Sequence, residues 1–520
     1  MTTTRQFRNE TPLGRLRKRA CSALCLLLIG FACTTTTGFA GDAASSKAPA
    51  SVEIPESVPK PGPAPDVRPP EPAIGKVGEL PIWHVERGRV PLVSVQFLLR
   101  CGAVNDPVGK EGLASLTASM LDEGAGDLDS VELAKALDRL GATFAVAASH
   151  ENCTVSLSVL ERHLGAALDV FADVLLRPTF DEKEWERVKT LRINDLRQAR
   201  DRPTHVARQV SAILLYGKDH PYGRPTSGYP ETVESISLDD IRAFYKKHWV
   251  SAGGVVVTCG NLKLAKLESL LEPRFGAWAS SDAPSAAADY QPPKLGDHAR
   301  PKIAIAHKEN AQQTVISIAG PGIPRKDPDY MALSLANIAF GGSFTSRLLQ
   351  NLRVKHSYTY NARSGFDRRM GQGLFTSSAS VRADATIASV AEFQKEYLAV
   401  RAGGLHEQEL TKARATLRNA VIRTLGTIDS TSGMFVNLAR NHLPSDEISR
   451  FVHLANTTSM AQVKAAIDRI VDWEAATIVL VGDLELIKSQ LEGSALAGSG
   501  QVVHVDDRGE VISEISFSKK

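Results

Sequence analysis

The sequence predicts an α+β protein made of two homologous halves, each a mixed or antiparallel sheet with packed helices in a sandwich-like arrangement. Three features recur in the same order: an opening strand, a charged helix with apolar residues at helical spacing, and a Val-rich or Ile-rich closing strand. The matched pairs are 93–97 with 314–318, the helices that follow Asp181 and His406, and 254–260 with 477–483. Strands, long helices and a final strand in this order indicate an α+β fold.

The first 40 residues have the composition of a secretory signal. Cations between Arg15 and Arg19 precede an apolar run, Ala20–Ala32, and a small-residue segment that ends at Ala40. This order predicts export, to the periplasm of a bacterium, with cleavage after Ala40, because the apolar run is too short for a membrane span. Two alternatives are a lipoprotein attached to a membrane through Cys33 and an ordinary buried N-terminal helix.

Composition divides the rest of the chain into two folded segments. Residues 41–77 are rich in Pro, Ala, Ser and Glu and cannot bury a core, so a disordered leader is predicted. The other predicted parts are a first domain over 78–280, a linker over 281–300, a second domain over 301–491 and a C-terminal tail over 492–520. Alternating apolar residues in the tail are compatible with an added edge strand.

Charge and cysteine content exclude two classes of protein. The 520 residues carry a formal net charge of only +3 without a basic stripe, which argues against a nucleic-acid partner. Cleavage at Ala40 would leave three irregularly spaced cysteines, Cys101, Cys153 and Cys259, so a disulfide-stapled framework is excluded. One bridge, such as Cys101 to Cys259, and three buried thiols are the alternatives.

Several segments carry a family resemblance. In the first half they are 91–97, 100–103, 112–121, 220–225 and 255–261. These segments resemble the first half of the insulinase/pitrilysin (M16) zinc-peptidase family, which includes the mitochondrial processing peptidases. The resemblance extends over both halves and implies that together they form one side of a clam-shell chamber.

The zinc motif of that family is degenerate in this chain. The resemblance aligns 112–121 with an inverted motif in which two His residues four apart bind zinc and a Glu between them is the base. Here the ligand positions hold Ser115 and Ser119, the base position holds Ala118, and Asp195 stands where the family has a third ligand, a Glu. A lone carboxylate without imidazoles is a poor zinc site. We therefore expect this chain to bind no metal.

No other sequence pattern rebuilds a metal site. The thirteen His residues include no pair with the i, i+4 spacing of a helical zinc clamp. His150 and Glu151 with Cys153 group ligand-type side chains, but these side chains would alternate between the faces of a strand. We expect a solvated strand end there.

The second half keeps the family's other signature. Gly341–Gly342, then Ser346–Leu348, then Arg353 and Tyr360 seven residues apart, are similar to the C-terminal half of the family. The resemblance implies that Arg353 and Tyr360 hydrogen-bond the substrate carbonyl or oxyanion beside the zinc, where fixed donors favour developing negative charge. The alternative is structural, with Arg353 paired to a carboxylate and Tyr360 half-buried in a strand.

Three neighbouring positions bear on this pair. Ser357 stands where the family usually has Gly, so we expect the turn between Arg353 and Tyr360 to differ. His356 is expected to be a solvent-exposed loop residue. Gly341–Gly342 lacks the Gly-Lys-Ser/Thr of a phosphate cradle and predicts a turn or close access for a substrate backbone.

A zinc-free first half with a retained Arg/Tyr second half suggests a division of labour. By resemblance, the chain is the non-catalytic subunit of an exported heterodimeric zinc metallopeptidase, whose zinc lies in a homologous partner and whose substrates are unfolded peptides. Three alternatives remain open: a stand-alone peptide-binding protein, a scaffold, and an independent enzyme with unrecognised zinc ligands.

Overall fold

The computed structural model describes residues 67–280, 290–296 and 298–517. The predicted signal segment 1–40, with Cys33, and residues 41–66 of the predicted leader lie outside this part of the chain. Among the described helices, none combines the length and the apolar character that crossing a membrane requires.

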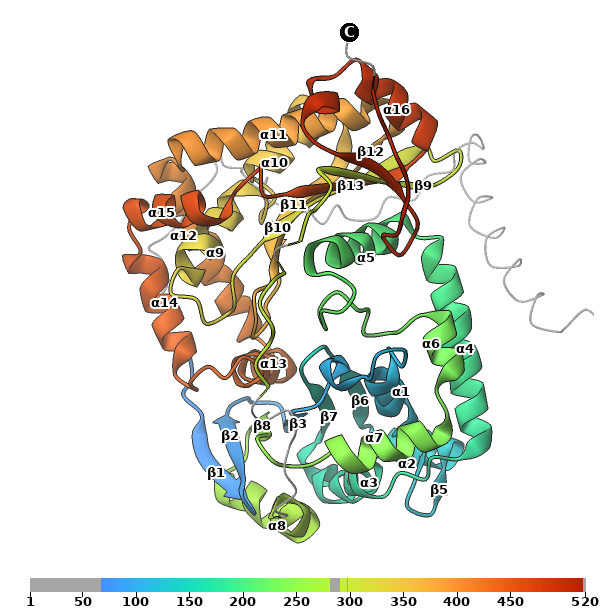
Figure 1. The fold of residues 1–520 in the computed structure, drawn as a ribbon. Helices are drawn as coiled ribbons and strands as arrows, with labels where there is room; N and C mark the ends of the chain where they lie inside the picture. Colours follow the sequence, from blue (N-terminus) through green and yellow to red (C-terminus); the bar gives the residue numbers. More distant parts are fainter. Residues whose placement is uncertain (1–66, 281–289, 297, 518–520) are drawn as a thin grey trace, which may run out of the picture. The chain divides into compact units, whose positions relative to one another are not determined.

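The first sheet contains six of the described strands (Figure 1). Their order is β1-β2-β8-β3-β7-β6. The strands are β1 (Ala73–Val77), β2 (Leu80–Glu86), β3 (Leu92–Leu99), β6 (Thr143–Ala148), β7 (Cys153–Leu160) and β8 (Val255–Gly260). β2 and β8 are parallel and the other neighbours are antiparallel. Every residue of β8 is buried, because this Val-rich strand is covered on both faces.

The second sheet repeats this arrangement. Its order is β11-β12-β10-β13-β9-β14-β15. The strands are β9 (Ile303–His307), β10 (Gln313–Pro321), β11 (Thr359–Phe366), β12 (Leu374–Arg382), β13 (Thr477–Gly482), β14 (Val502–Val505) and β15 (Val511–Glu514). β9 and β13 are parallel, and β10 lies antiparallel between β13 and β12, as β3 does between β8 and β7. The prediction of a duplicated α+β fold is confirmed.

The segment after Leu491 is part of the second sheet rather than a separate tail. β14 pairs in parallel with β9, and β15 pairs with β14. The valines of β14 are buried, whereas all four residues of β15 are exposed, so only β14 contributes to the buried core.

The helices follow the same duplicated order. In the first half they are α1 (Leu113–Met120), α2 (Ser130–Leu140), α3 (Leu164–Leu176), α4 (Glu182–Arg200), α5 (Pro203–Tyr216), α6 (Pro230–Ser235), α7 (Leu238–His248) and α8 (Leu264–Ala279). In the second half they are α9 (Tyr330–Phe340), α10 (Arg347–Leu349), α11 (Thr386–Gly403), α12 (Glu407–Thr424), α13 (Ile428–Arg440), α14 (Glu447–Thr457), α15 (Met460–Ile470) and α16 (Leu484–Glu492). A short hairpin, β4 (Gly124–Ala125) with β5 (Leu128–Asp129), precedes α2.

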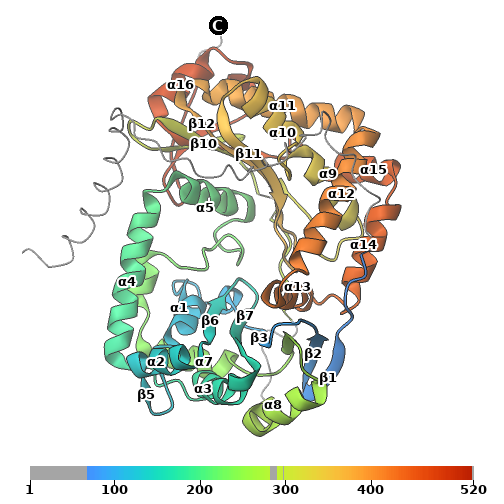
Figure 2. The same cartoon turned by 180° about the vertical axis from the view of Figure 1, so that it is seen from behind.

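The two halves exchange a helix with each other (Figures 1 and 2). α5, from the first half, packs Val206 and Val210 on the second sheet against Val479 of β13. α13, from the second half, packs Phe435 on the first sheet against Val257 of β8. Each half therefore has a core cluster of its own, and two further clusters, under α5 and under α13, are built from both halves.

The direction of α5 is set by the chain between α4 and α5. Pro203 occupies the first turn of α5, where the missing N–H of proline leaves no hydrogen bond unmade. The residue before a proline avoids helical geometry, and Arg202 is extended, at φ −94° and ψ 106°. α4 therefore ends at Arg200, and α5 starts in a new direction, towards the second sheet.

A buried arginine ties the exchanged α13 to the first half. The Arg100 guanidinium donates to the carbonyl oxygens of Ala439 at 2.8 Å and Arg440 at 3.1 Å, at the C-terminal end of α13. It also donates to Gly253 and to Asn152. A cation at a helix C-terminus is favoured by the helix dipole, so Arg100 caps α13 from across the boundary between the halves.

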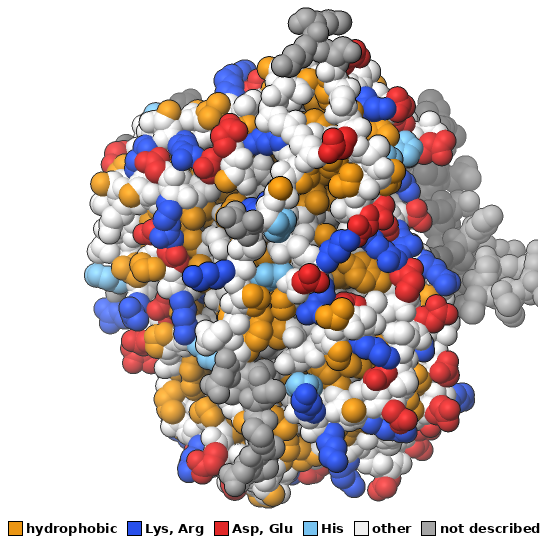
Figure 3. Space-filling model, in the orientation of Figure 1, with side chains coloured by type: hydrophobic (Ala, Val, Ile, Leu, Met, Phe, Trp, Pro, Cys, Tyr) orange, Lys and Arg blue, Asp and Glu red, His pale blue; other side chains and the backbone are white. Residues whose placement is uncertain are grey.

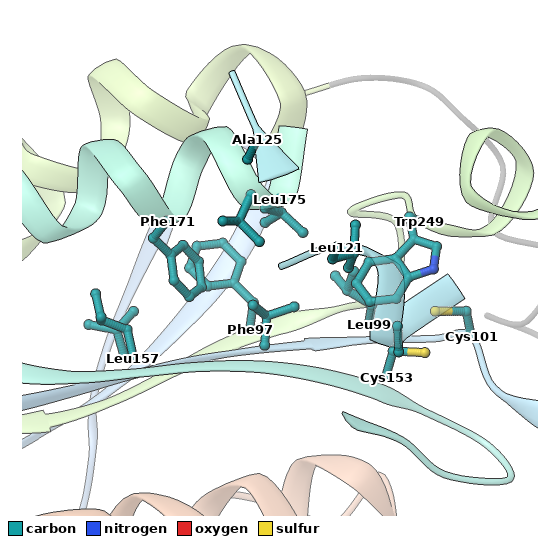
Figure 4. Packing of buried hydrophobic residues seen from close by; sticks show 14 of the residues in the cluster. Phe97, Leu99, Cys101, Leu121, Ala125, Cys153, Leu157, Phe171, Leu175 and Trp249 are labelled. Carbon is teal, nitrogen blue, oxygen red and sulfur yellow. The ribbon is translucent and has the colours of Figure 1, made fainter. Parts of the chain in front are cut away.

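The core of the first half is a cluster of aromatic and aliphatic side chains (Figure 4). The Phe97 ring centroid lies 5.2 Å from that of Phe171 and 4.8 Å from that of Phe275. Cys101 and Cys153 belong to this cluster, whereas Cys259 belongs to the cluster under α13. The three described cysteines are buried free thiols, and the example pairing of Cys101 with Cys259 is not formed.

Candidate functional site

The degenerate zinc-motif positions face an arginine from a neighbouring helix. Ser115 and Ser119 lie one turn apart on α1 and are partly buried. Arg192 of α4 donates from Nη1 to Ser115 Oγ at 3.0 Å and from Nη2 to Ser119 Oγ at 3.2 Å. Ala118, at the base position, is 2% exposed and belongs to the hydrophobic core. One guanidinium therefore bridges the two hydroxyls that replace the imidazoles.

The residues at this position do not fit zinc. A guanidinium keeps its positive charge and has no lone pair for a metal, so Arg192 disfavours a cation beside the serines. Burial lowers the pKa of Arg192, and the Asp195 carboxylate opposes this shift. Asp195 itself is exposed. Across the described residues, no group of three or more His, Cys, Asp or Glu side chains could hold a metal ion.

The start of α1 is fixed by an aspartate. The Asp106 carboxylate accepts from the backbone N–H of Gly112 at 2.9 Å and of Ala114 at 2.8 Å. Burial raises the pKa of Asp106 to about 7, and these two N–H donors partly offset the shift. Gly112 has φ +102°, and a Cβ there would lie 2.9 Å from the Ser227 carbonyl oxygen, so α1 packs too closely for a side chain.

Arg353 and Tyr360, which the sequence pairs by spacing, are in contact. The Arg353 guanidinium carbon lies 4.5 Å from the centroid of the Tyr360 ring and 5.8 Å from that of Phe344. Tyr360 is 79% exposed and Phe344 is 76% exposed. Within the described residues Arg353 has no ion-pair partner. The structural alternative of a carboxylate-paired Arg353 and a half-buried Tyr360 is therefore wrong.

The turn that joins the pair is irregular. Arg353 lies in a π-helical turn, Gln350–Lys355, which follows α10. Ser357 has φ +54°, a left-handed conformation that favours glycine, and donates its N–H to the Arg353 carbonyl at 3.1 Å. The serine thus keeps the backbone geometry that suits the family's usual glycine at this position.

His356 differs from its predicted environment. Its ring stacks on Tyr358 at a centroid distance of 5.0 Å, and its Nε2 lies 3.6 Å from a Glu392 carboxylate oxygen. Its side chain is 24% exposed, so His356 is a packed residue rather than a solvent-exposed loop residue. The sequence could not indicate this contact, because Glu392 lies on α11.

The two glycines of the second half allow a close backbone approach. A Cβ on Gly341 would lie 2.3 Å from Ser364 Oγ, and one on Gly342 would lie 2.8 Å from Asn337 Nδ2. The Gly341 carbonyl accepts from the Ser364 N–H of β11 at 3.1 Å. The glycine loop therefore joins the end of α9 to the edge strand that carries Tyr360.

The prediction of a solvated strand end at His150 and Glu151 is wrong. Glu151 is 6% exposed, accepts from the Tyr222 hydroxyl, and accepts from the Met370 N–H at 3.1 Å. Burial raises the pKa of Glu151, and the Tyr222 hydrogen bond opposes the shift. The Gly371 N–H donates to the Tyr222 hydroxyl at 3.2 Å. These residues join the first half to the loop between β11 and β12.

Arg192 and Phe344 were not singled out by the sequence patterns. Arg192 precedes Asp195 by three residues, a spacing that places both on one helical face, so helical periodicity could have indicated it. Phe344 lies two residues after Gly342, and no sequence pattern distinguishes an exposed Phe from a buried one.

Comparison with known proteins identifies the family. The model of the insulinase domain of peptidase family M16 matches residues 86–227, and that of the M16 inactive domain matches residues 235–417. An uncharacterized zinc protease of Bacillus subtilis is 23% identical over 368 residues, which cover 70% of this chain and 87% of that protein. A non-peptidase homolog of Helicobacter pylori is 24% identical over 343 residues, which cover 65% of this chain and 77% of that protein.

A solved structure extends the comparison to the fold. The crystal structure of a peptidase M16 inactive domain from Pseudomonas fluorescens superposes with a TM-score of 0.72 at 26% identity and covers 79% of this chain and 98% of that chain. The zinc-motif positions of the present chain hold serine and alanine, and the two serines are hydrogen-bonded to Arg192. The chain therefore lacks the residues of a peptidase zinc centre. The chain belongs to the M16 insulinase family of peptidases as a non-catalytic member.

Proposed function

We propose that this protein is the non-catalytic subunit of an exported, heterodimeric M16-type zinc metallopeptidase. In this proposal the partner is a homologue with an intact motif that supplies the zinc, and the present chain supplies substrate binding and the Arg353–Tyr360 pair. One observation carries the proposal: Arg192 binds both hydroxyls at the former ligand positions, whereas Tyr360 is exposed and the partly buried Arg353 has no competing acid among the described residues.

The chemistry of the pair suits a site completed by another subunit. A guanidinium and a phenol hydroxyl are donors that favour negative charge on a substrate oxygen. Stacking on Tyr360 limits the motion of Arg353, which lowers the entropy lost when both groups bind one carbonyl.

The surface around the pair supports association. Phe344, Val354, which is 63% exposed, and Tyr360 surround Arg353 with apolar surface. Exposed aromatic side chains with arginine are the composition of protein interfaces. We propose that a partner subunit and its substrate cover this surface.

The proposed location is the periplasm of a bacterium. The charged, apolar and small-residue order of 1–40 supports export, and the alternative form is a lipoprotein attached at Cys33. Mass spectrometry of the mature chain would distinguish an N-terminus at Gly41 from a lipid-modified Cys33.

The test is peptide cleavage by reconstituted subunits. A quenched fluorescent peptide is incubated with this protein, with the zinc-motif homologue from the same cell, and with an equimolar mixture that contains zinc. We expect activity to require the mixture and to fall about 100-fold or more with Arg353→Ala or Tyr360→Phe. Tyr358→Phe is the matched control, because this variant removes a neighbouring phenol that makes no described hydrogen bond.

Two results would contradict the proposal. One is an inactive mixture whose components elute separately from a sizing column. The other is a mixture in which Arg353→Ala and Tyr358→Phe have equal activity. Either result would leave a stand-alone peptide-binding or scaffold role.

A further inference from the structure

A cleft of about 680 Å³ lies between α5 and the part of the second sheet that α5 leaves uncovered. α5 covers β14, β9, β13 and part of β10, whereas β12 and the edge strand β11 extend beyond it. The floor of the cleft is a row of hydroxyl side chains on one face of β10 and β12. They are Thr376, Ser378 and Ser380, which are partly buried, and Ser317, which is buried and whose hydroxyl is hydrogen-bonded to that of Ser211 of α5 at 2.9 Å. A floor of this kind offers hydrogen bonds without demanding one particular side chain.

The two walls of the cleft carry unpaired positive charge. Arg208 on α5 and Arg363 on β11 both line the cleft and are exposed. Neither has an ion-pair partner in the described part of the chain. Arg369 is a third cation, and it is paired at 3.3 Å with Asp367, which is the one acidic residue of the described lining.

This excess of arginine is local. On the face of the protein drawn in Figure 3, basic and acidic side chains are intermixed. The whole chain has a formal net charge of only +3. Arg208 and Arg363 therefore give the cleft an excess of positive charge that the surface in general does not have. A concave site strengthens the local electrostatic potential.

The cleft leads to the Arg353–Tyr360 pair. It runs beside β11, which has eight residues, and Tyr360 lines both this cleft and the adjoining hollow that contains Arg353. An extended segment of about eight residues has the length of β11. One end of such a segment would lie at Tyr360.

We infer that this cleft binds an extended acidic peptide segment, with Arg208 and Arg363 pairing with its carboxylates from opposite walls. The inference rests on the proposed function, since it names the substrate class of the same subunit. Guanidinium groups bind carboxylates through two parallel N–H bonds, and the hydroxyl floor satisfies polar groups of the peptide. Single-stranded nucleic acid binding uses a series of aromatic rings for base stacking, whereas the described lining contains only Tyr360 and Phe366.

The test is direct binding to this chain alone. Fluorescence anisotropy is measured with three labelled unstructured decapeptides that carry Glu, Gln or Lys at alternate positions of a Gly/Ser background. We expect the Glu peptide to bind at least tenfold more tightly than the Lys peptide, and the difference to shrink as ionic strength rises.

Charge reversal locates the site. We expect Arg208→Glu and Arg363→Glu each to weaken binding of the Glu peptide about two- to fivefold, and the double variant about tenfold or more. Arg139→Glu on α2 is the control, because it makes the same charge change at an exposed arginine of the first half and should leave binding unchanged.

The outcomes separate this inference from the proposed subunit role. Equal affinity for the three peptides would overturn the inference even if the reconstituted enzyme is active. So would a loss of Glu-peptide affinity with Arg139→Glu that equals the loss with Arg208→Glu or Arg363→Glu. Tighter binding of a single-stranded oligonucleotide than of the Glu peptide would also overturn it. Selective binding of the Glu peptide without any association with a zinc-bearing homologue would sustain the inference that the cleft binds acidic peptides and would refute the subunit role.

Discussion

The contact of Arg192 with α1 predicts that this arginine keeps zinc away from the degenerate motif. The perturbation compares two variants that restore ligands by Ser115→His, Ser119→His and Asp195→Glu. One retains Arg192 and the other adds Arg192→Met, which removes the guanidinium but keeps an unbranched apolar side chain.

The magnitude follows from the geometry. Arg192 lies 3.0 and 3.2 Å from the hydroxyl oxygens that the new imidazoles would replace, so zinc bound there would lie about 4 Å from a guanidinium. Charges of +1 and +2 at that distance repel by about 2 kcal/mol in water and about 8 kcal/mol at an effective dielectric constant of about 20. Even the lower value weakens zinc binding about 30-fold.

The assay is competition for zinc with a chromophoric chelator. We expect the variant with Arg192→Met to bind zinc at least about 30-fold more tightly than the variant that retains Arg192. Arg197→Met on the same helix is the matched control, since Arg197 is exposed and should not affect affinity. Equal zinc affinities with and without the Arg192→Met substitution, or an equal gain from Arg197→Met, would refute the reasoning.

Three further predictions concern stability. Arg100→Met leaves the carbonyls at the end of α13 without their buried donor, so urea unfolding should show a loss of about 1 to 3 kcal/mol; no loss would contradict this capping role. Ser357→Gly relieves a left-handed serine and should raise the free energy of unfolding by up to about 1 kcal/mol, and a lower melting temperature would argue against strain at this turn. Burial lowers the pKa of His84, so its neutral form contributes stability above about pH 6.5 that is lost as pH falls through the folded pKa. Urea midpoints at pH 7 and pH 5 should therefore differ less in His84→Gln than in the native chain. An equal difference would exclude His84 as a source of the pH dependence of stability.

The duplicated fold could be predicted because its signals are local. The opening and closing strands, such as 93–97 and 477–483, are marked by apolar runs, and the charged helices by their spacing. The exchange of α5 and α13 could not be predicted in the same way. An amphipathic pattern shows that a helix buries one face, but not which sheet receives it.

In the candidate site, too, some features could be predicted from the sequence and others could not. Residue types alone indicated that Ser115 and Ser119 cannot replace imidazole ligands, and spacing alone paired Arg353 with Tyr360. The role of Arg192 required the packing of α4 against α1, which is a contact over 77 residues of sequence. The burial of Glu151 likewise depends on a loop of the second half, so a local strand pattern suggested exposure instead.

Arg192 at the degenerate motif and Arg353 of the retained pair differ in a way that supports different roles. Arg192 is satisfied by hydroxyls of its own chain, so its guanidinium has little free energy to gain from a ligand. Arg353 is stacked between exposed rings and has no described acid within ion-pair distance, so most of its donors remain available. A ligand that brings an oxygen to Arg353 displaces water but breaks no described hydrogen bond within the chain, which is the condition for a prepared binding group. Loss of metal ligands at one site therefore does not predict loss of binding at the other, which is why the proposed role separates peptide binding by this chain from zinc chemistry in a partner.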